Sequence, residues 1–151
     1  MSTSNQEQLG NKIHIGVLGA GSMGVGIAQI AATNKHQVVL VDLNPEALIN
    51  AKASLTKILA RLVEKEKIDE LTAQEIIERI QFSNESTNFK NCGLVIEAIV
   101  ENLEVKKTVF TQLEAIVSDT CILASNTSSL SIASIASACK KADRVIGIHF
   151  F

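Results

Sequence analysis

The sequence of 151 residues contains no tryptophan and no tyrosine, and aromatic residues make up only 3% of it. Proteins that bind single-stranded nucleic acid stack bases on such side chains, so their scarcity disfavours this class. The formal net charge is −2, with acids and bases interspersed, which predicts no basic surface for nucleic acid or an anionic membrane. No apolar run approaches the ~20 residues that cross a bilayer. We expect a soluble protein with neither nucleic-acid nor membrane partners.

Cysteine is also scarce, and the three thiols are Cys92, Cys121 and Cys139. Their odd number and wide spacing, without a C-x-x-C pair, disfavour a disulfide scaffold and a zinc site. We predict three reduced, packed thiols, a cytoplasmic location and no metal. The polar stretch 1–12 lacks the apolar core of a signal peptide, and we expect it to form a flexible N-terminal arm.

Apolar strand patterns alternate with amphipathic helix patterns along the rest of the chain. The strand patterns cover 13–18, 36–42, 93–99, 120–125 and 144–150, and the helix patterns cover 22–34, 46–65, 72–80, 102–118 and 130–139. This alternation predicts βαβ units, and strands without polar alternation predict a parallel sheet covered on both faces. The predicted fold is one Rossmann-type, doubly wound, mainly parallel α/β domain over 13–151, with a helical arm inserted after the second strand.

Between the first strand and the first helix lies a G-x-G-x-x-G pattern, formed by Gly19, Ala20, Gly21, Ser22, Met23 and Gly24. Gly19 permits a tight turn, Gly21 lets the backbone approach a pyrophosphate, and Gly24 lets the helix pack closely on the strand. The N–H groups and dipole at the helix start attract the anion. We predict that all six residues bind a dinucleotide.

Asp42 ends the second predicted strand, 18 residues after Gly24. A carboxylate at this position can accept a hydrogen bond from the 2′-hydroxyl of an adenosine ribose, and it would repel a 2′-phosphate. No arginine follows it, so the sequence favours NAD over NADP. The alternative is a glycine-rich turn next to an unrelated surface acid.

Four motifs occur in order, namely GAGSMGVGIAQ, VIEAIVENLEVK, ASNTSSL and GIHFF. Together they closely resemble the N-terminal NAD-binding domain of the L-3-hydroxyacyl-CoA dehydrogenases, including those of the 3-hydroxybutyryl-CoA type. The resemblance implies oxidation of L-3-hydroxyacyl-CoA to 3-oxoacyl-CoA with NAD, in fatty-acid oxidation or butanoate metabolism. It also implies that a helical C-terminal domain follows residue 151, forms a homodimer and supplies the acid that orients the catalytic histidine. The 151 residues alone would then be inactive.

The resemblance assigns roles to the last two motifs. His149 matches the family's catalytic histidine, at the carboxyl end of a strand, where open α/β sheets bind ligands. An imidazole can take the 3-hydroxyl proton at neutral pH while hydride leaves the adjacent carbon. Ser128 matches a serine between the substrate oxygen and the nicotinamide, and Asn126 is a further cofactor-site candidate. Without the resemblance, His149 would be a structural histidine and the SNTSS stretch an ordinary turn and helix cap.

Glu101 and Lys106 match family residues that contact the cofactor, and Glu97 is a further candidate for lining its site. The alternative for Glu101 and Lys106 is a solvent-exposed acid–base pair at the start of a helix, which contributes little to stability.

The helical arm resembles the segment that reaches toward CoA in the family, and Lys65 matches a lysine contact there. Lys57 and Lys67 are plausible neighbours, but Ile58 stands where relatives carry a hydroxyl group. The alternative is a solvated run of charges on an amphipathic helix.

Two other functions stay open at this stage. A related β-hydroxyacid dehydrogenase would need a catalytic lysine in a later domain and would leave the GIHFF motif unexplained. A non-enzymatic, crystallin-like NAD-binding protein would keep the nucleotide fold in a structural role. The acyl chain length, and the choice between a standalone enzyme and part of a multifunctional β-oxidation protein, are also left open.

Overall fold

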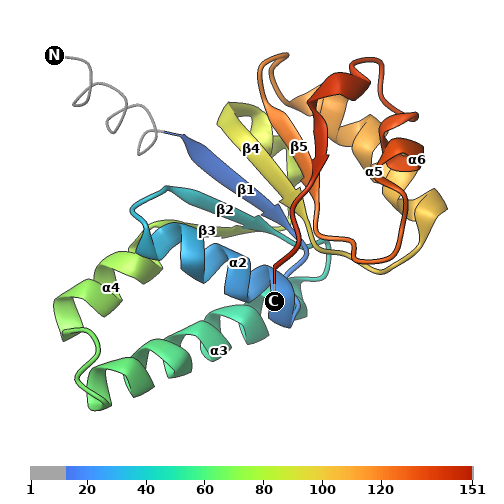
Figure 1. Ribbon diagram of the computed structural model, residues 1–151. Coiled ribbons are helices and arrows are strands. Elements are labelled where there is room, and N and C mark those ends of the chain that lie inside the picture. Colours follow the sequence, from blue (N-terminus) through green and yellow to red (C-terminus); the bar gives the residue numbers. More distant parts are fainter. Residues whose placement is uncertain (1–12, 151) are drawn as a thin grey trace, which may run out of the picture.

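The structure is a computed structural model that describes residues 13–150, so the predicted arm (1–12) and Phe151 lie outside the described residues. Within this range a six-stranded, wholly parallel sheet has the strand order β3-β2-β1-β4-β5-β6 (Figure 1). The strands are β1 (His14–Leu18), β2 (Val38–Val41), β3 (Ile80–Ser83), β4 (Cys92–Glu97), β5 (Ile122–Ser125) and β6 (Val145–Gly147). The predicted fold class is confirmed.

Helices cover both faces of the sheet, which creates two apolar cores (Figure 1). One core lies under α2 (Ser22–Thr33), α3 (Pro45–Glu64) and α4 (Glu70–Glu78). The other lies under α5 (Leu103–Ile116), α6 (Ile132–Ala136) and the 3₁₀ turn η1 (Ser86–Asn91), and a short 3₁₀ turn η2 (Ala142–Arg144) precedes β6. None of the described helices is both long and apolar enough to cross a membrane.

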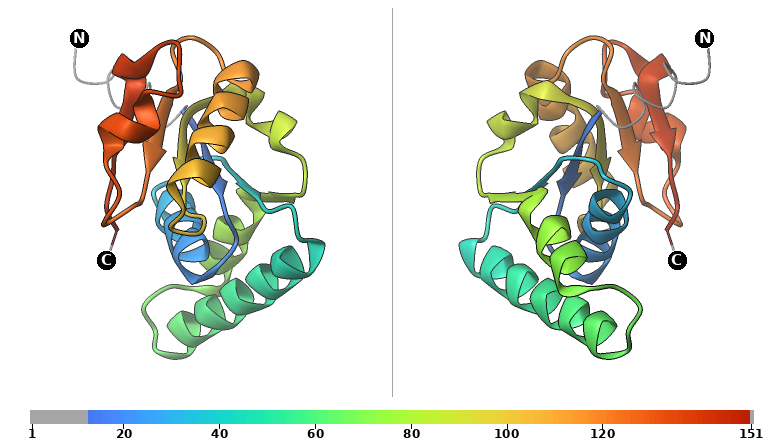
Figure 2. Two further views of the ribbon diagram at one scale, coloured as in Figure 1. Left: turned by 90° about the vertical axis from the view of Figure 1, so that its right-hand side faces the viewer. Right: turned by 90° about the vertical axis from the view of Figure 1, so that its left-hand side faces the viewer.

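The local signals for α3 act as the sequence predicts. Asn44 is the N-cap, and its side-chain oxygen accepts a hydrogen bond of 3.0 Å from the backbone N–H of Glu46. Pro45 occupies the first helical position, where a missing N–H costs nothing. Figure 2 shows that α3 and the turn after it extend away from the sheet, as a helical arm should.

The sequence patterns missed one strand and overestimated the length of two elements. β3 is an edge strand that was assigned to the end of a helix at residue 80 and to irregular chain beyond it, because IQFS lacks an apolar run. α6 has only five residues instead of the predicted ten. β6 ends at Gly147, so His149 lies just beyond the carboxyl end of this strand rather than within it.

The change of direction in strand order falls between β1 and β4, whose following loops diverge to opposite faces of the sheet. Open α/β sheets bind ligands in the crevice outside the carboxyl ends of such strands. The loops after β1 and β4 pack closely here, since the N–H of Ala98 donates to the carbonyl oxygen of Leu18 at 2.8 Å. The fold therefore predicts a ligand site at the carboxyl edge of β1, β4, β5 and β6.

Candidate active site at the carboxyl edge of the sheet

The glycine loop joins β1 directly to α2 and leaves the start of this helix open. Gly19, Ala20 and Gly24 are buried, whereas Gly21, Ser22 and Met23 are exposed. Gly21 is the N-cap and provides no side-chain cap, and no acidic residue lies in the first turn of α2. The first N–H groups of the helix thus have no side-chain cap and are available to an anion.

Two glycines in this loop have steric reasons to be glycine. A Cβ atom at Gly24 would lie 1.7 Å from the carbonyl oxygen of Gly19, so only glycine lets α2 approach the turn this closely. Gly19 has a φ of +109°, in the region that favours glycine. A Cβ atom at Gly21 would meet nothing within 4 Å, so this part of the backbone faces open space. These features fit a pyrophosphate at Gly21 and the start of α2.

The Asp42 carboxylate connects the glycine loop to the end of β2. Its Oδ2 accepts a hydrogen bond of 2.9 Å from the N–H of Ala20, and its Oδ1 accepts one of 2.9 Å from the N–H of Asn44. A carboxylate offers about four lone-pair positions, so each oxygen can still accept a ribose hydroxyl. Asp42 is therefore placed against the loop, as the ribose assignment requires.

Both predicted catalytic residues, His149 and Ser128, line a pocket of about 280 Å³. It is lined by Met23 after β1, by residues 97–99 together with Glu101 and Lys106 around and after β4, by Asn126 and Ser128 after β5, and by His149 and Phe150 after β6. Residues that lie far apart in the sequence thus meet at one edge of the sheet. Asp42 does not line this pocket; it contacts the glycine loop instead.

His149 is positioned by bonds on both sides of it along the chain. The N–H of Ile148 donates to the carbonyl oxygen of Ser125 at 3.0 Å, and the N–H of Phe150 donates to Oδ1 of Asn126 at 2.8 Å. Asn126 therefore contributes its side-chain oxygen to the backbone beside His149. The sequence offered Asn126 as a cofactor-site candidate or as a helix cap, and the motif gave no signal for its contact with the backbone of Phe150.

Glu97 and Lys106 form a buried ion pair on the wall of the pocket. Their side chains are 0% and 1% exposed, and Lys106 Nζ lies 2.5 Å from Glu97 Oε2. Lys106 Nζ also lies 3.2 Å from Glu101 Oε1 and 3.4 Å from the carbonyl oxygen of Ile99. The three protons of this ammonium group thus have three protein oxygens as acceptors. The alternative interpretation was a solvent-exposed pair of Glu101 and Lys106; the two side chains do pair, but Lys106 is buried and also bonds to Glu97.

Glu101 carries this network to the loop that contains Ser128. Its Oε2 accepts hydrogen bonds from the hydroxyl groups of Thr127 at 2.6 Å and Ser129 at 2.9 Å. Thr127, followed by Ser129 and Lys106, holds the pKa of the Glu101 carboxyl below its ordinary value. Ser128 lies between the two donors, is exposed and lines the pocket.

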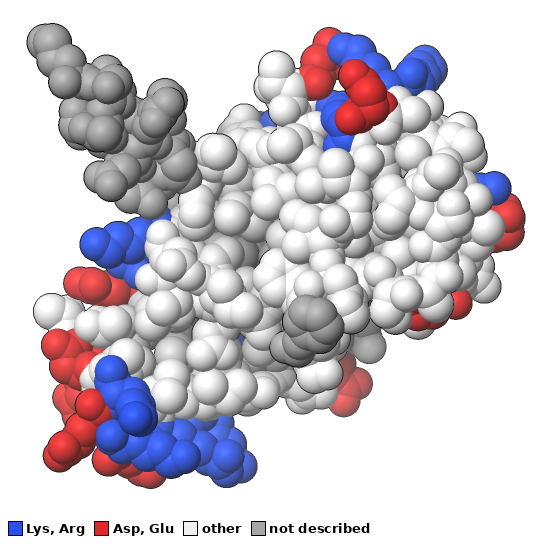
Figure 3. Space-filling model, in the orientation of Figure 1, with Lys and Arg blue, Asp and Glu red and all other residues white. Residues whose placement is uncertain are grey.

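The helical arm places its predicted lysines elsewhere. Lys65 is the C-cap of α3 and is exposed, as are Lys57 and Lys67. With a rise of 1.5 Å per residue, the 20 residues of α3 put Lys65 about 30 Å from the start of the helix. In Figure 3, lysines and arginines mix with acidic residues at the lower left, where α3 ends in Figure 1. The structure does not bring Lys65 to the pocket of His149.

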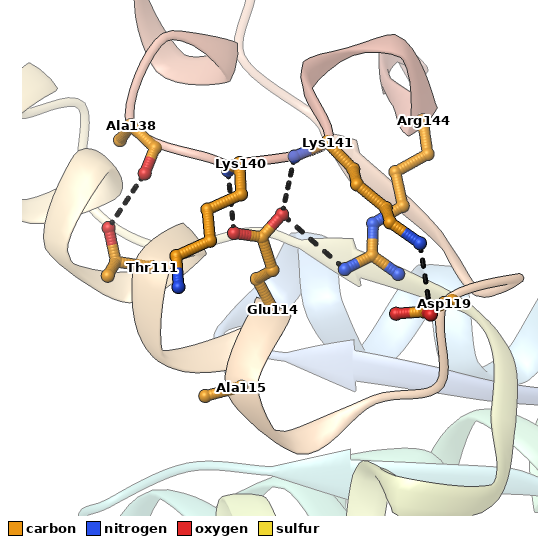
Figure 4. A pocket seen from close by; sticks show the side chains of 8 residues that line it. All are labelled: Thr111, Glu114, Ala115, Asp119, Ala138, Lys140, Lys141 and Arg144. Carbon is orange, nitrogen blue, oxygen red and sulfur yellow. Dashed lines mark hydrogen bonds and ion pairs between the residues drawn. The ribbon is translucent and has the colours of Figure 1, made fainter.

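A second pocket, of about 350 Å³, lies toward the amino ends of β5 and β6 (Figure 4). In it Glu114 accepts hydrogen bonds from the backbone N–H groups of Lys140 at 2.7 Å and Lys141 at 3.0 Å, and it lies 3.5 Å from the guanidinium group of Arg144. Lys141 also pairs with Asp119 at 3.0 Å. These contacts fasten the segment before β6 to α5, at the opposite end of the strands from His149.

The three thiols are free and buried, as predicted. Burial raises the pKa of Cys92 to about 12 and that of Cys121 to about 11, and it also raises the pKa of Cys139. Among residues 13–150, no group of three or more histidine, cysteine or acidic side chains is arranged to hold a metal ion.

The sequence profile of the NAD-binding domain of 3-hydroxyacyl-CoA dehydrogenase matches residues 14–151. The chain belongs to this family. NAD is therefore the cofactor of this domain, which agrees with the open helix start and the placement of Asp42. The resemblance seen in the four motifs is confirmed.

Relatives agree with the family assignment. A probable 3-hydroxybutyryl-CoA dehydrogenase from Deinococcus radiodurans is 44% identical over 135 residues, covering 89% of this chain and 48% of that protein. Human mitochondrial hydroxyacyl-coenzyme A dehydrogenase is 42% identical over 144 residues, covering 91% of this chain and 46% of that protein. The crystal structure of an (S)-3-hydroxybutyryl-CoA dehydrogenase from Ralstonia eutropha gives a TM-score of 0.89 at 40% identity, covering 91% of this chain and 49% of that one. The chain spans about half the length of these relatives.

Proposed function

We propose that this chain supplies the cofactor half of an enzyme that oxidises an L-3-hydroxyacyl-CoA to the 3-oxoacyl-CoA with NAD, in fatty-acid oxidation or butanoate metabolism. The observation that carries the proposal is the pocket that His149, Ser128 and Met23 line together. It places a candidate base and a hydroxyl group next to the loop that binds the dinucleotide. The 44% identity to a probable 3-hydroxybutyryl-CoA dehydrogenase supports the substrate class.

Oxidation of the 3-hydroxyl group breaks its O–H bond and the C–H bond of the carbon that carries it. NAD, when bound, accepts the hydride from that carbon. His149 takes the hydroxyl proton onto a ring nitrogen, since imidazole exchanges protons near neutral pH. In the reverse direction the imidazolium group returns this proton to the oxygen. Such general-base catalysis contributes typically ~10² to 10⁴-fold to a rate.

Ser128 is proposed to hydrogen-bond the reacting oxygen. Its side chain is exposed to the pocket that His149 also lines. A hydroxyl group donates and accepts, so it can serve both the alcohol and the ketone form of the substrate. The pair would orient the substrate oxygen between two polar groups while the hydrogen on carbon faces the cofactor.

The CoA portion is proposed to reach along the helical arm to Lys65. A lysine that is exposed at the end of α3 can pair with a phosphate without disturbing the fold. Because Lys65 lies far from His149 along the arm, its contribution would be to binding rather than to the chemical step. Ile58 and the neighbouring acids of the arm would make this contact weaker than a cluster of lysines would.

We also propose that the protein works in the cytoplasm and as a homodimer. Three buried, free thiols support a reducing compartment. The dimer rests on the family resemblance alone and is tested by sedimentation of the whole protein.

The test is to assay the whole protein with acetoacetyl-CoA and NADH, comparing His149→Gln with His36→Gln as a control. His36 is partly buried at the amino side of the sheet, where its Nδ1 lies 3.0 Å from the carbonyl oxygen of Ile13. We expect a fall in kcat of roughly 10² to 10⁴-fold for His149→Gln and no fall for the control. An unchanged rate in His149→Gln would exclude His149 as the base, and an inactive wild type would exclude the substrate class.

A further inference from the structure

Glu97, which lines the pocket, is a fully buried carboxylate at the end of β4. Besides Lys106, its oxygens accept hydrogen bonds from the hydroxyl group of Ser125 at 2.6 Å and from the N–H of Ile99 at 2.7 Å. Its backbone oxygen accepts a further hydrogen bond of 2.9 Å from the N–H of Asn126. These contacts of Glu97 thus reach the loop after β4, the helix α5 that follows this loop, the end of β5 and the loop after β5.

Stability alone is a poor reason for a charge at this position. Removing two ions from water costs several kcal/mol each, and replacing a buried pair by apolar residues is often neutral or stabilising. A buried ion pair at this position therefore suggests a demand for a defined geometry. Glu97 and Lys106 are neighbours of Glu101, so negative, positive and negative groups follow one another from the core toward the pocket.

This row of charges leads to Ser128 by two routes. On one route Lys106 holds Glu101, whose carboxylate holds Thr127 and Ser129 on either side of Ser128. On the other route Glu97 holds Ser125, and the hydroxyl oxygen of Ser125 accepts a hydrogen bond of 3.2 Å from the N–H of Thr127. Both routes end at the loop of Ser128, and one residue, Glu97, begins both.

We propose that Glu97 is a positioning residue that sets the nicotinamide end of the cofactor site by fixing the loops after β4 and β5. The proposal rests on the proposed function, which puts the hydride-accepting ring beside His149 and Ser128. The pyrophosphate and adenosine ribose bind elsewhere, at Gly21 and Asp42. Loss of Glu97 should therefore weaken the binding of the nicotinamide end and spare the adenosine end.

This selectivity separates positioning from a general loss of fold. NADH contains both ends of the cofactor, whereas ADP-ribose lacks the nicotinamide. A variant that merely unfolds part of the protein loses affinity for both ligands, but a variant that misplaces the loop of Ser128 loses affinity for NADH alone.

The experiment measures the binding of NADH and ADP-ribose to the whole protein by calorimetry, for the wild type, Glu97→Gln and Glu114→Gln. The control removes an acid with several hydrogen bonds at the other end of the strands. For Glu97→Gln we expect a loss of at least tenfold in NADH affinity and a change within about twofold in ADP-ribose affinity. We expect Glu114→Gln to leave both affinities within about twofold.

Glu97→Gln leaves Lys106 with a weaker partner, so this variant can fail to fold. The double variant Glu97→Gln with Lys106→Met removes both charges and keeps a similar volume, and it should show the same selective loss. Affinities for NADH within twofold of the wild type, or equal losses for NADH and ADP-ribose in this folded double variant, would overturn the proposal. A wild type that binds ADP-ribose without any preference for NADH would instead contradict the proposed function.

Discussion

Two glycines of α2 that are two residues apart should respond to alanine in opposite ways. Alanine is better than glycine in a helix by ~1 kcal/mol, and this gain applies to Gly24 and Gly26 alike. At Gly26 a Cβ atom meets nothing within 4 Å, so Gly26→Ala should raise the free energy of unfolding by about 1 kcal/mol. At Gly24 the Cβ atom would lie 1.7 Å from the carbonyl oxygen of Gly19, which is backbone and cannot turn aside.

Gly24→Ala must therefore push α2 away from the turn after β1 by about 1.3 Å, because Cβ atoms essentially never lie closer than 3.0 Å to a neighbouring atom. Overpacking of this kind costs typically 1–3 kcal/mol, so the net change should be a destabilisation of up to about 2 kcal/mol after the helix gain is subtracted. The same displacement moves the N–H groups that face the pyrophosphate, and NADH affinity should fall at least tenfold, a change of ~1.4 kcal/mol.

Urea unfolding of both variants, followed by circular dichroism, measures the stability, since the chain has no tryptophan to report fluorescence. NADH fluorescence measures the binding. If Gly24→Ala matched Gly26→Ala in stability and in NADH affinity, the close approach of Gly24 to Gly19 would not be the reason for glycine there.

Other features lead to shorter predictions. NADH should bind at least tenfold tighter than NADPH, and Asp42→Ala should narrow this gap; equal affinities of the wild type would refute the ribose assignment. Lys65→Ala in the whole protein should raise KM for the CoA substrate and leave kcat nearly unchanged, and an unchanged KM would show that Lys65 does not bind the substrate. The three buried thiols should react with an aromatic disulfide reagent only as fast as the protein unfolds, because burial raises their pKa values; rapid reaction of the native protein would contradict this. Hydrogen bonds from the backbone of Lys141 and Lys140 hold the pKa of Glu114 below its ordinary value of 4.5, so its contribution to stability is complete above that value and is lost as the pH falls through the lower folded one. Acid titration of Glu114→Gln should then show a weaker loss of stability below pH 4.5 than the wild type, and parallel curves would refute the assignment.

The parts of the fold that the sequence predicted are those with a strong local signal. β1 and β2 are runs of apolar residues that the helices bury on both sides, and α3 begins with a cap, a proline and an acid in the expected order. β3 has no such signal, because it is an edge strand in which only Ile80 is buried. Its place in the sheet depends on pairing with β2, which the residues of β3 alone do not reveal.

The residues of the site likewise fall into those with a local sequence signal and those without one. The tight turn at Gly19 and the close packing at Gly24 were predicted because they depend on backbone geometry within one turn, and the structure shows both. The contact of Asn126 beside His149 could not be predicted in this way, because the N–H of Phe150 donates to Oδ1 of Asn126 from a position 24 residues away. A motif shows that such residues recur together, but it does not show which atom of one contacts the other.

Lys106 shows most clearly what a sequence pattern leaves out. The sequence left two interpretations for it, a contact with the cofactor or one half of a solvent-exposed pair with Glu101, yet its side chain is 1% exposed and its ammonium group faces Glu97. The clue was present in β4, where an acid ends an otherwise apolar strand, because a buried carboxylate needs a cation or several hydrogen-bond donors nearby. Lys106 of the following helix meets this requirement together with the hydroxyl group of Ser125 and the N–H of Ile99. It follows that a lysine near a cofactor loop can act by holding an acid in place, and Lys106 is best tested by its effect on Glu101 and Ser128 before it is given a direct contact with NAD.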